Sequence, residues 1–105
     1  MPALPIPADL IDLQRALDAA RAELAAFIAK VEAARREQFP APEQVVERQT
    51  WPEGQYARRE ELRAVAIAAD DAVRTHPVMM CAMEEHRYEA TEQALRAAAR
   101  GGTGA

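Results

Sequence analysis

Residues 9–38, DLIDLQRALDAARAELAAFIAKVEAARREQ, decide the fold of this chain of 105 residues. Apolar side chains recur there at steps of three and four, which is the spacing of one helix face and of a coiled-coil seam. The seam consists of Leu10, Leu13, Leu17, Ala20, Leu24, Phe27, Val31 and Ala34. The spacing predicts one helix of about 45 Å, and a helix of this length needs a partner along its whole apolar face.

Prolines and glycines predict that both ends of the chain lie outside the helices. Three prolines within residues 1–8 predict an extended arm, because proline fixes φ and removes a backbone donor. Three glycines within residues 101–105 predict a flexible tail, since glycine commonly ends a helix. Between them, residues 9–100 are expected to form a single helical domain.

An irregular connector is predicted over residues 39–56. Pro40 and Pro42 end the first helix, because a proline inside a helix removes a hydrogen bond and clashes with the preceding turn. The letters WPEG further along predict a turn, with Pro52 at its second position and Gly54 able to take a positive φ.

Two more helices are predicted, over about 57–75 and 77–100. Pro77 separates them, because the residue before a proline avoids the α region and proline suits the first position of a helix. His76 then stands where its side chain can cap the last helix. A break at Pro77 gives a three-helix bundle, and a kink gives a long antiparallel helical hairpin. Either is an all-α fold with coiled-coil-like packing.

Composition and charge narrow the classes of function. Half of the residues are hydrophobic and alanine is the commonest of them, which predicts a thin core and self-association as a dimer. The net charge of −4 does not favour a nucleic-acid partner, and no apolar run is long enough to predict a membrane partner. A single Cys and the absence of a signal-peptide pattern lead us to expect a cytoplasmic protein.

The stretch RTHPVMMCAMEEHRYE, residues 74–89, contains both histidines and the only cysteine. His76, Cys81 and His86 are residue types that bind metals or catalyse nucleophilic reactions, so a metal-binding protein or a small helical enzyme is one alternative. Zinc sites of the structural kind use four Cys or His ligands, and this chain has three such residues. The main interpretation is therefore the apolar start of a helix, with no metal, no cofactor and no catalytic residue.

Residues 13–37, LQRALDAARAELAAFIAKVEAARRE, resemble the first helix of the small all-helical chorismate mutases. Leu13, Asp18 and Lys30 fall at compatible positions over about a quarter of the chain. The resemblance implies an intertwined helical dimer with an active site rich in cations. However, the family's first catalytic Arg falls at Gln14, and its later catalytic Lys has no counterpart because Lys30 is the only lysine. The sequence does not assemble the cations that a dianionic substrate needs.

Two arginine clusters flank the connector and suggest a second alternative. Arg35 and Arg36 precede it, and Arg58, Arg59 and Arg63 follow it. If the two clusters converge, the chain is a candidate for a small DNA-binding regulator. Acidic residues follow each cluster directly, which is also typical of solvated helix ends.

The sequence predicts a non-enzymatic helical protein that binds a partner protein or a second copy of itself. Self-association is expected through the seam from Leu10 to Ala34, and partner binding through aromatic residues of the connector. The candidate interaction residues are Leu10, Leu13, Leu17, Leu24, Phe27, Val31, Trp51 and Tyr56.

Overall fold

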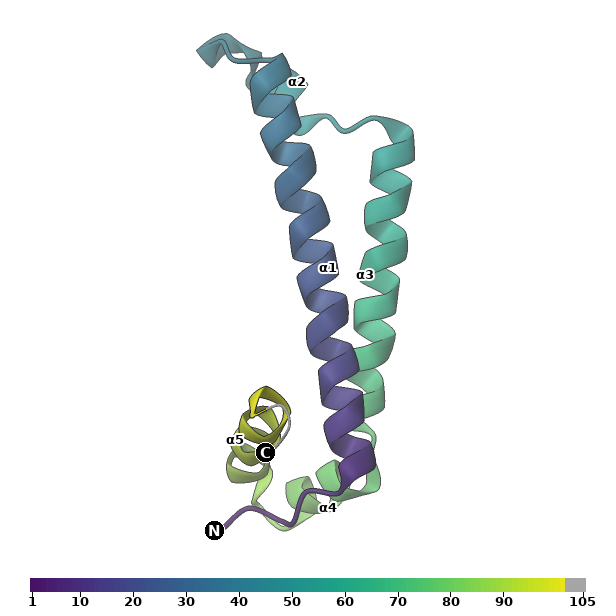
Figure 1. Ribbon diagram of the computed structural model, residues 1–105, viewed down its shortest axis with the longest axis vertical. Helices are drawn as coiled ribbons and strands as arrows, with labels where there is room; N and C mark the ends of the chain where they lie inside the picture. Colours follow the sequence, from purple (N-terminus) through teal and green to yellow (C-terminus); the bar gives the residue numbers. More distant parts are fainter. Residues whose placement is uncertain (102–105) are drawn as a thin grey trace. The chain divides into compact units, whose positions relative to one another are not determined.

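The computed structural model describes residues 1–101 and confirms the all-α class, with no strand in that part of the chain. The elements are α1 (Ala8–Gln38), the 3₁₀ turn η1 (Pro42–Gln44), α2 (Val45–Gln49), α3 (Glu53–Arg74), α4 (Pro77–Glu84) and α5 (Tyr88–Arg100), drawn in Figure 1. No helix within 1–101 is long and apolar enough to cross a membrane. Residues 102–105, most of the predicted tail, lie outside the described part.

The chain divides into two compact units. Unit 1 comprises Met1–Ala19 and Ile67–Ala105, and unit 2 comprises Ala20–Ala66. The long helices α1 and α3 each contribute residues to both units. The single domain expected over 9–100 and its coiled-coil-like packing stay predictions.

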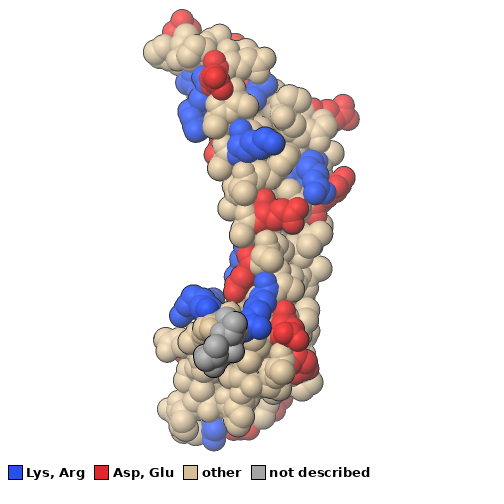
Figure 2. Space-filling model, in the orientation of Figure 1, with Lys and Arg blue, Asp and Glu red and all other residues tan. Residues whose placement is uncertain are grey.

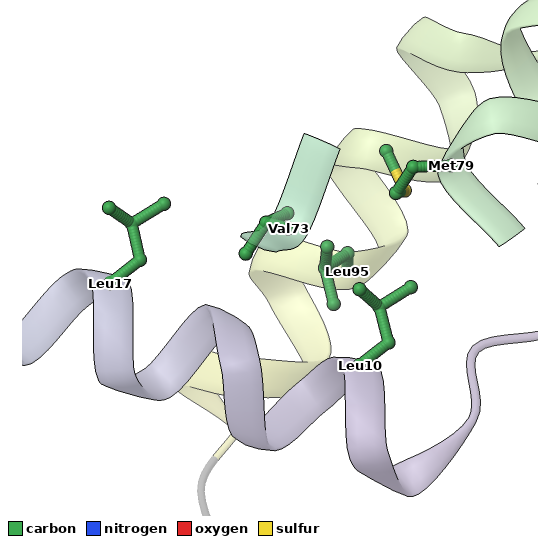
Figure 3. Packing of buried hydrophobic residues seen from close by; sticks show 5 residues of the cluster. All are labelled: Leu10, Leu17, Val73, Met79 and Leu95. Carbon is green, nitrogen blue, oxygen red and sulfur yellow. The ribbon is translucent and has the colours of Figure 1, made fainter. Parts of the chain in front are cut away.

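The core of unit 1 draws one or two side chains from each of four helices. Leu10 and Leu17 of α1, Val73 of α3, Met79 of α4 and Leu95 of α5 are all buried and form one cluster. Figure 3 shows Leu10, Leu95, Val73 and Met79 gathered between their helices. Burying a side chain of this size contributes about 1.5–3 kcal/mol, so these contacts hold the four helix segments of unit 1 together.

The N-terminal arm ends at Pro7, since α1 begins at Ala8, and it contacts the same core. Residues 1–7 have no regular secondary structure, and Ile6 packs against the apolar cluster. The backbone N–H of Leu4 donates a 3.1 Å hydrogen bond to Oγ1 of Thr91, which is fully buried in α5. A buried hydroxyl needs a partner, and the arm provides one.

Pro77 breaks the chain between α3 and α4, which confirms the first of the two alternatives. His76 precedes the new helix as its N-cap, with extended backbone angles of −60° and 139°. Its Nδ1 accepts a 3.1 Å hydrogen bond from the N–H of Val78, which has no partner inside the helix. The predicted capping role of His76 is therefore confirmed.

The predicted continuous helix over 77–100 is wrong, because the chain reverses between α4 and α5. His86 takes a left-handed backbone conformation with φ of 58°. The N–H of Arg87 donates to the C=O of Ala82 at 2.7 Å, and the N–H of His86 donates to the C=O of Met83 at 3.2 Å. This pair of bonds is the Schellman motif, which satisfies the last carbonyls of a helix. Glycine usually marks that position, and its absence hides the break from sequence reasoning.

The predicted turn at WPEG and the predicted helix start near 57 are also wrong. Helix α3 begins at Glu53, and the N–H of Tyr56 donates a 2.9 Å bond to the C=O of Pro52. A proline is tolerated at the start of a helix, because the first N–H groups have no helical acceptor there. Gly54 therefore lies in the first turn of α3, where an added Cβ would meet nothing within 4 Å apart from its chain neighbours and the helix's own backbone.

Candidate functional site

Unit 2 brings Trp51 and Tyr56 together around one arginine. The guanidinium carbon of Arg59 lies 4.6 Å from the ring centroid of Trp51 and 5.0 Å from that of Tyr56. Trp51 also contacts Phe27 of α1, whose ring meets it edge to face at 6.0 Å between centroids and 67° between planes. Two of the predicted interaction residues thus share a site, and a third, Phe27, supports it.

A hollow of about 360 Å³ opens beside the Trp51 ring. Its walls come from the C-terminal half of α1, the connector and the first turns of α3. The lining residues are Glu32, Arg36, Arg48, Gln49, Trp51 and Arg59. Three of the six are arginines and one is a carboxylate, so cationic groups dominate the lining.

Arg48 positions the connector part of this site. Its Nη1 donates to the C=O of Phe39 at 2.8 Å and to the C=O of Ala41 at 2.7 Å. The N–H of Ala41 in turn donates to Oε1 of Gln44 at 2.9 Å, which closes the turn between α1 and α2. Because these acceptors are neutral carbonyl groups, the positive charge of Arg48 meets no carboxylate in these contacts.

Unit 2 as a whole is balanced in charge. It contains eight basic and eight acidic residues, whereas unit 1 contains five basic and nine acidic ones. Figure 2 shows basic side chains over the end of unit 2 that carries α2, with acidic side chains among them. An extended polyanion such as DNA is attracted by a broad basic face, so this balance does not favour the DNA-binding alternative.

The arginine clusters converge in part. Arg36 and Arg59 line the same hollow, whereas Arg58 pairs with Glu61 at 3.1 Å and with Glu23 at 3.6 Å. Sequence reasoning missed Arg48, the third arginine of the site. Its one sequence signal is that it is the only basic residue between Phe39 and Tyr56.

The predicted seam residues differ in burial, and Ala34 at the end of the seam is exposed. Leu10, Leu17 and Val31 are 0, 2 and 3% exposed, and Leu13 packs against the unit 1 cluster. Leu24 is half-buried in unit 2. The part of the seam from Leu10 to Leu17 therefore packs within unit 1, whereas Leu24, Phe27 and Ala34 keep exposed surface.

The histidine and cysteine positions do not form a joint site. His76 Nε2 lies 2.9 Å from Oδ2 of Asp9, and this hydrogen bond holds the pKa of Asp9 below its usual range. Cys81 Sγ donates a 2.8 Å hydrogen bond to Oε2 of Glu85, and that contact raises the pKa of the thiol. Within residues 1–101, no three His, Cys, Asp or Glu side chains are grouped as a metal site would require.

An apolar hollow of about 490 Å³ lies beside Cys81 in unit 1. The arm contributes Leu4, Pro5, Ile6 and Pro7 to its wall, and α4 contributes Pro77, Val78 and Cys81. The raised pKa keeps Cys81 as a thiol at neutral pH, which is unfavourable for a nucleophile. This hollow therefore offers apolar contact, and its one thiol is not activated as a nucleophile.

The position that aligns with the first catalytic arginine of the chorismate mutases lies in the unit 1 part of α1. Gln14 is 3% exposed there, and its Nε2 donates a 2.9 Å hydrogen bond to Oδ1 of Asp18. The neighbouring Arg15 donates from Nε to the C=O of Ala99 at 3.3 Å. Comparison with protein-family models, curated proteins and solved structures finds no match to this chain.

Proposed function

We propose that this chain is a non-enzymatic helical protein that binds a partner protein through the surface around Trp51, Tyr56 and Arg59. The observation that carries the proposal is the position of one guanidinium carbon over both aromatic rings, at 4.6 and 5.0 Å from their centroids. Tryptophan, tyrosine and arginine are the residue types that contribute most binding energy at protein interfaces.

The geometry also lowers the cost of binding. Trp51 is held between Phe27 and Arg59, so little side-chain freedom is left to lose when a partner covers it. Tyr56 is 50% exposed, which leaves an amphipathic ring available for contact. Trp51 and Tyr56 therefore form a binding surface that is already ordered in the absence of a partner.

Variant-dependent capture of a binding partner tests the proposal. The wild-type chain and the variants Tyr56→Ala and Val65→Ala would be immobilised and compared by quantitative mass spectrometry of bound proteins. Val65 is the matched control, because it is an exposed apolar residue of the same unit, 58% accessible. We expect at least a tenfold loss of the partner with Tyr56→Ala and no loss with Val65→Ala. Equal capture by all three proteins would refute the proposal.

Self-association through the seam from Leu10 to Ala34 is a second candidate. The observation that favours it is that Leu24 and Phe27 stay half-buried in unit 2. A second copy would cover the apolar surface that they leave open. We expect light scattering to give twice the chain mass of 11.6 kDa, and Leu24→Asp to halve that mass with unchanged helicity. A monomeric wild-type chain would refute this candidate.

A further inference from the structure

We propose that the hollow beside Trp51 binds a phosphate monoester. The inference deepens the proposed function, since a phosphorylated side chain of the partner protein is one source of this group. A small phosphate ester is the other source, and both present the same dianionic headgroup.

The charges that line the hollow fit a dianion. Arg36, Arg48 and Arg59 supply three positive charges, and Glu32 is the only carboxylate among the six lining residues. The lining therefore has two positive charges in excess. Guanidinium groups bind phosphate oxygens in paired, in-plane hydrogen bonds, which makes arginine the preferred residue for such a headgroup.

Each arginine keeps donors or charge that the chain itself does not use. No hydrogen bond or ion pair within the described residues 1–101 engages the side chain of Arg36. The contacts of Arg48 are to neutral carbonyl groups. Arg59 has one carboxylate contact, to Glu60 at 3.7 Å, which is longer than a hydrogen bond.

The rings of Trp51 and Tyr56 restrain the side chain of Arg59. Its guanidinium carbon lies over the rings of Trp51 and Tyr56, and these contacts limit where the group can move. The N–H bonds of a guanidinium lie in its plane, and the contact with Glu60 is longer than a hydrogen bond, so donors of Arg59 remain for a ligand. Two carbonyl groups likewise fix Arg48, so two of the three cations are held in place without a ligand.

The size of the hollow leaves room for more than the phosphate. Its volume of about 360 Å³ lies at the lower end of the range of ligand pockets, roughly 300–1,000 Å³. The indole of Trp51 forms an apolar part of the wall next to the cations. A phosphate on a short carbon chain, such as a phosphorylated side chain, matches this combination.

The single tryptophan of the chain allows a direct binding measurement. Trp51 fluorescence would be titrated with O-phosphoserine, with sodium chloride at equal ionic strength as the salt control. We expect a saturable change with the wild-type chain and at least a tenfold weaker response in Arg36→Gln. Arg63→Gln is the matched control, because Arg63 is exposed in the same unit and does not line the hollow.

Three results would overturn the inference. The first is a response that does not saturate or that chloride reproduces. The second is equal weakening by Arg36→Gln and Arg63→Gln, which would indicate diffuse attraction to basic residues. The third is tighter binding of a single-stranded oligonucleotide than of any phosphate ester, which would assign the site to nucleic acid.

A second titration separates the sources of the phosphate. A short peptide with one phosphoserine that binds at least tenfold tighter than free O-phosphoserine supports a partner protein, whereas equal affinity supports a small ester. The two proposals also fail separately. Partner capture that needs Tyr56, with no phosphate binding, would overturn the phosphate site alone. Phosphate binding that needs Arg36, with no captured partner, would overturn the partner-binding proposal alone.

Discussion

Replacing His86 with glycine and with alanine tests the chain reversal that separates α4 from α5. His86 has a φ of 58°, where a side chain with a Cβ costs about 1 kcal/mol or more and glycine does not. We expect His86→Gly to be more stable than His86→Ala by about 1 kcal/mol. The side chain of His86 is exposed, so both variants should report mainly on the backbone.

The sign of this difference decides between two structures. In the interior of a continuous helix, alanine is favoured over glycine by about 1 kcal/mol, so the order of the two variants would be reversed. Urea denaturation followed by far-UV circular dichroism measures the difference in unfolding free energy. In thermal unfolding, 1 kcal/mol corresponds to roughly 4–8 °C for a small domain.

An exposed residue inside α5 provides the control. Gln93 lies in the middle of Tyr88–Arg100, so Gln93→Ala should be more stable than Gln93→Gly by about 1 kcal/mol. Opposite signs at residues 86 and 93 confirm the reversal. If alanine is the more stable replacement at both, the helix is continuous and the left-handed conformation of His86 is refuted.

Three further predictions concern unit 1. Leu95→Ala should lower the free energy of unfolding by about 2–5 kcal/mol, because this side chain is fully buried; a loss below 1 kcal/mol in urea denaturation would contradict that packing. Because its folded-state pKa is lowered, Asp9 should contribute stability at pH values above its ordinary 3.8, and this contribution should be lost as the pH falls through the folded-state pKa. The variant His76→Asn keeps a capping side chain but loses the hydrogen bond to Asp9, so carbon-detected NMR should show the pKa of Asp9 returning toward 3.8. An unchanged pKa of Asp9 would rule out His76 as the cause. Because the Glu85 carboxylate raises the pKa of Cys81, Glu85→Gln should shift the pH profile of iodoacetamide alkylation to lower pH, and an unshifted profile would show that the contact does not form in solution.

The sequence by itself determined the elements whose cause is local. The three-four spacing from Leu10 to Val31 specifies a long amphipathic helix, and α1 spans Ala8–Gln38. Pro77 specifies a helix start because its own ring restricts the residue before it, and His76 is the N-cap there. Such features depend on neighbours a few residues away, which the sequence displays directly.

Tertiary structure decided the features that depend on distant residues. The reversal at His86 places a non-glycine residue at φ of 58°, and the buried contacts of Met79 and Leu95 on either side of it offset the strain. The arginine site likewise required the fold, because residues 36, 48 and 59 come from three different elements. Spacing in the sequence carries no information about which helix faces meet across a connector. The convergence of the three arginines beside Trp51 depends on the packing of unit 2, where Phe27 and Arg59 hold the indole in place.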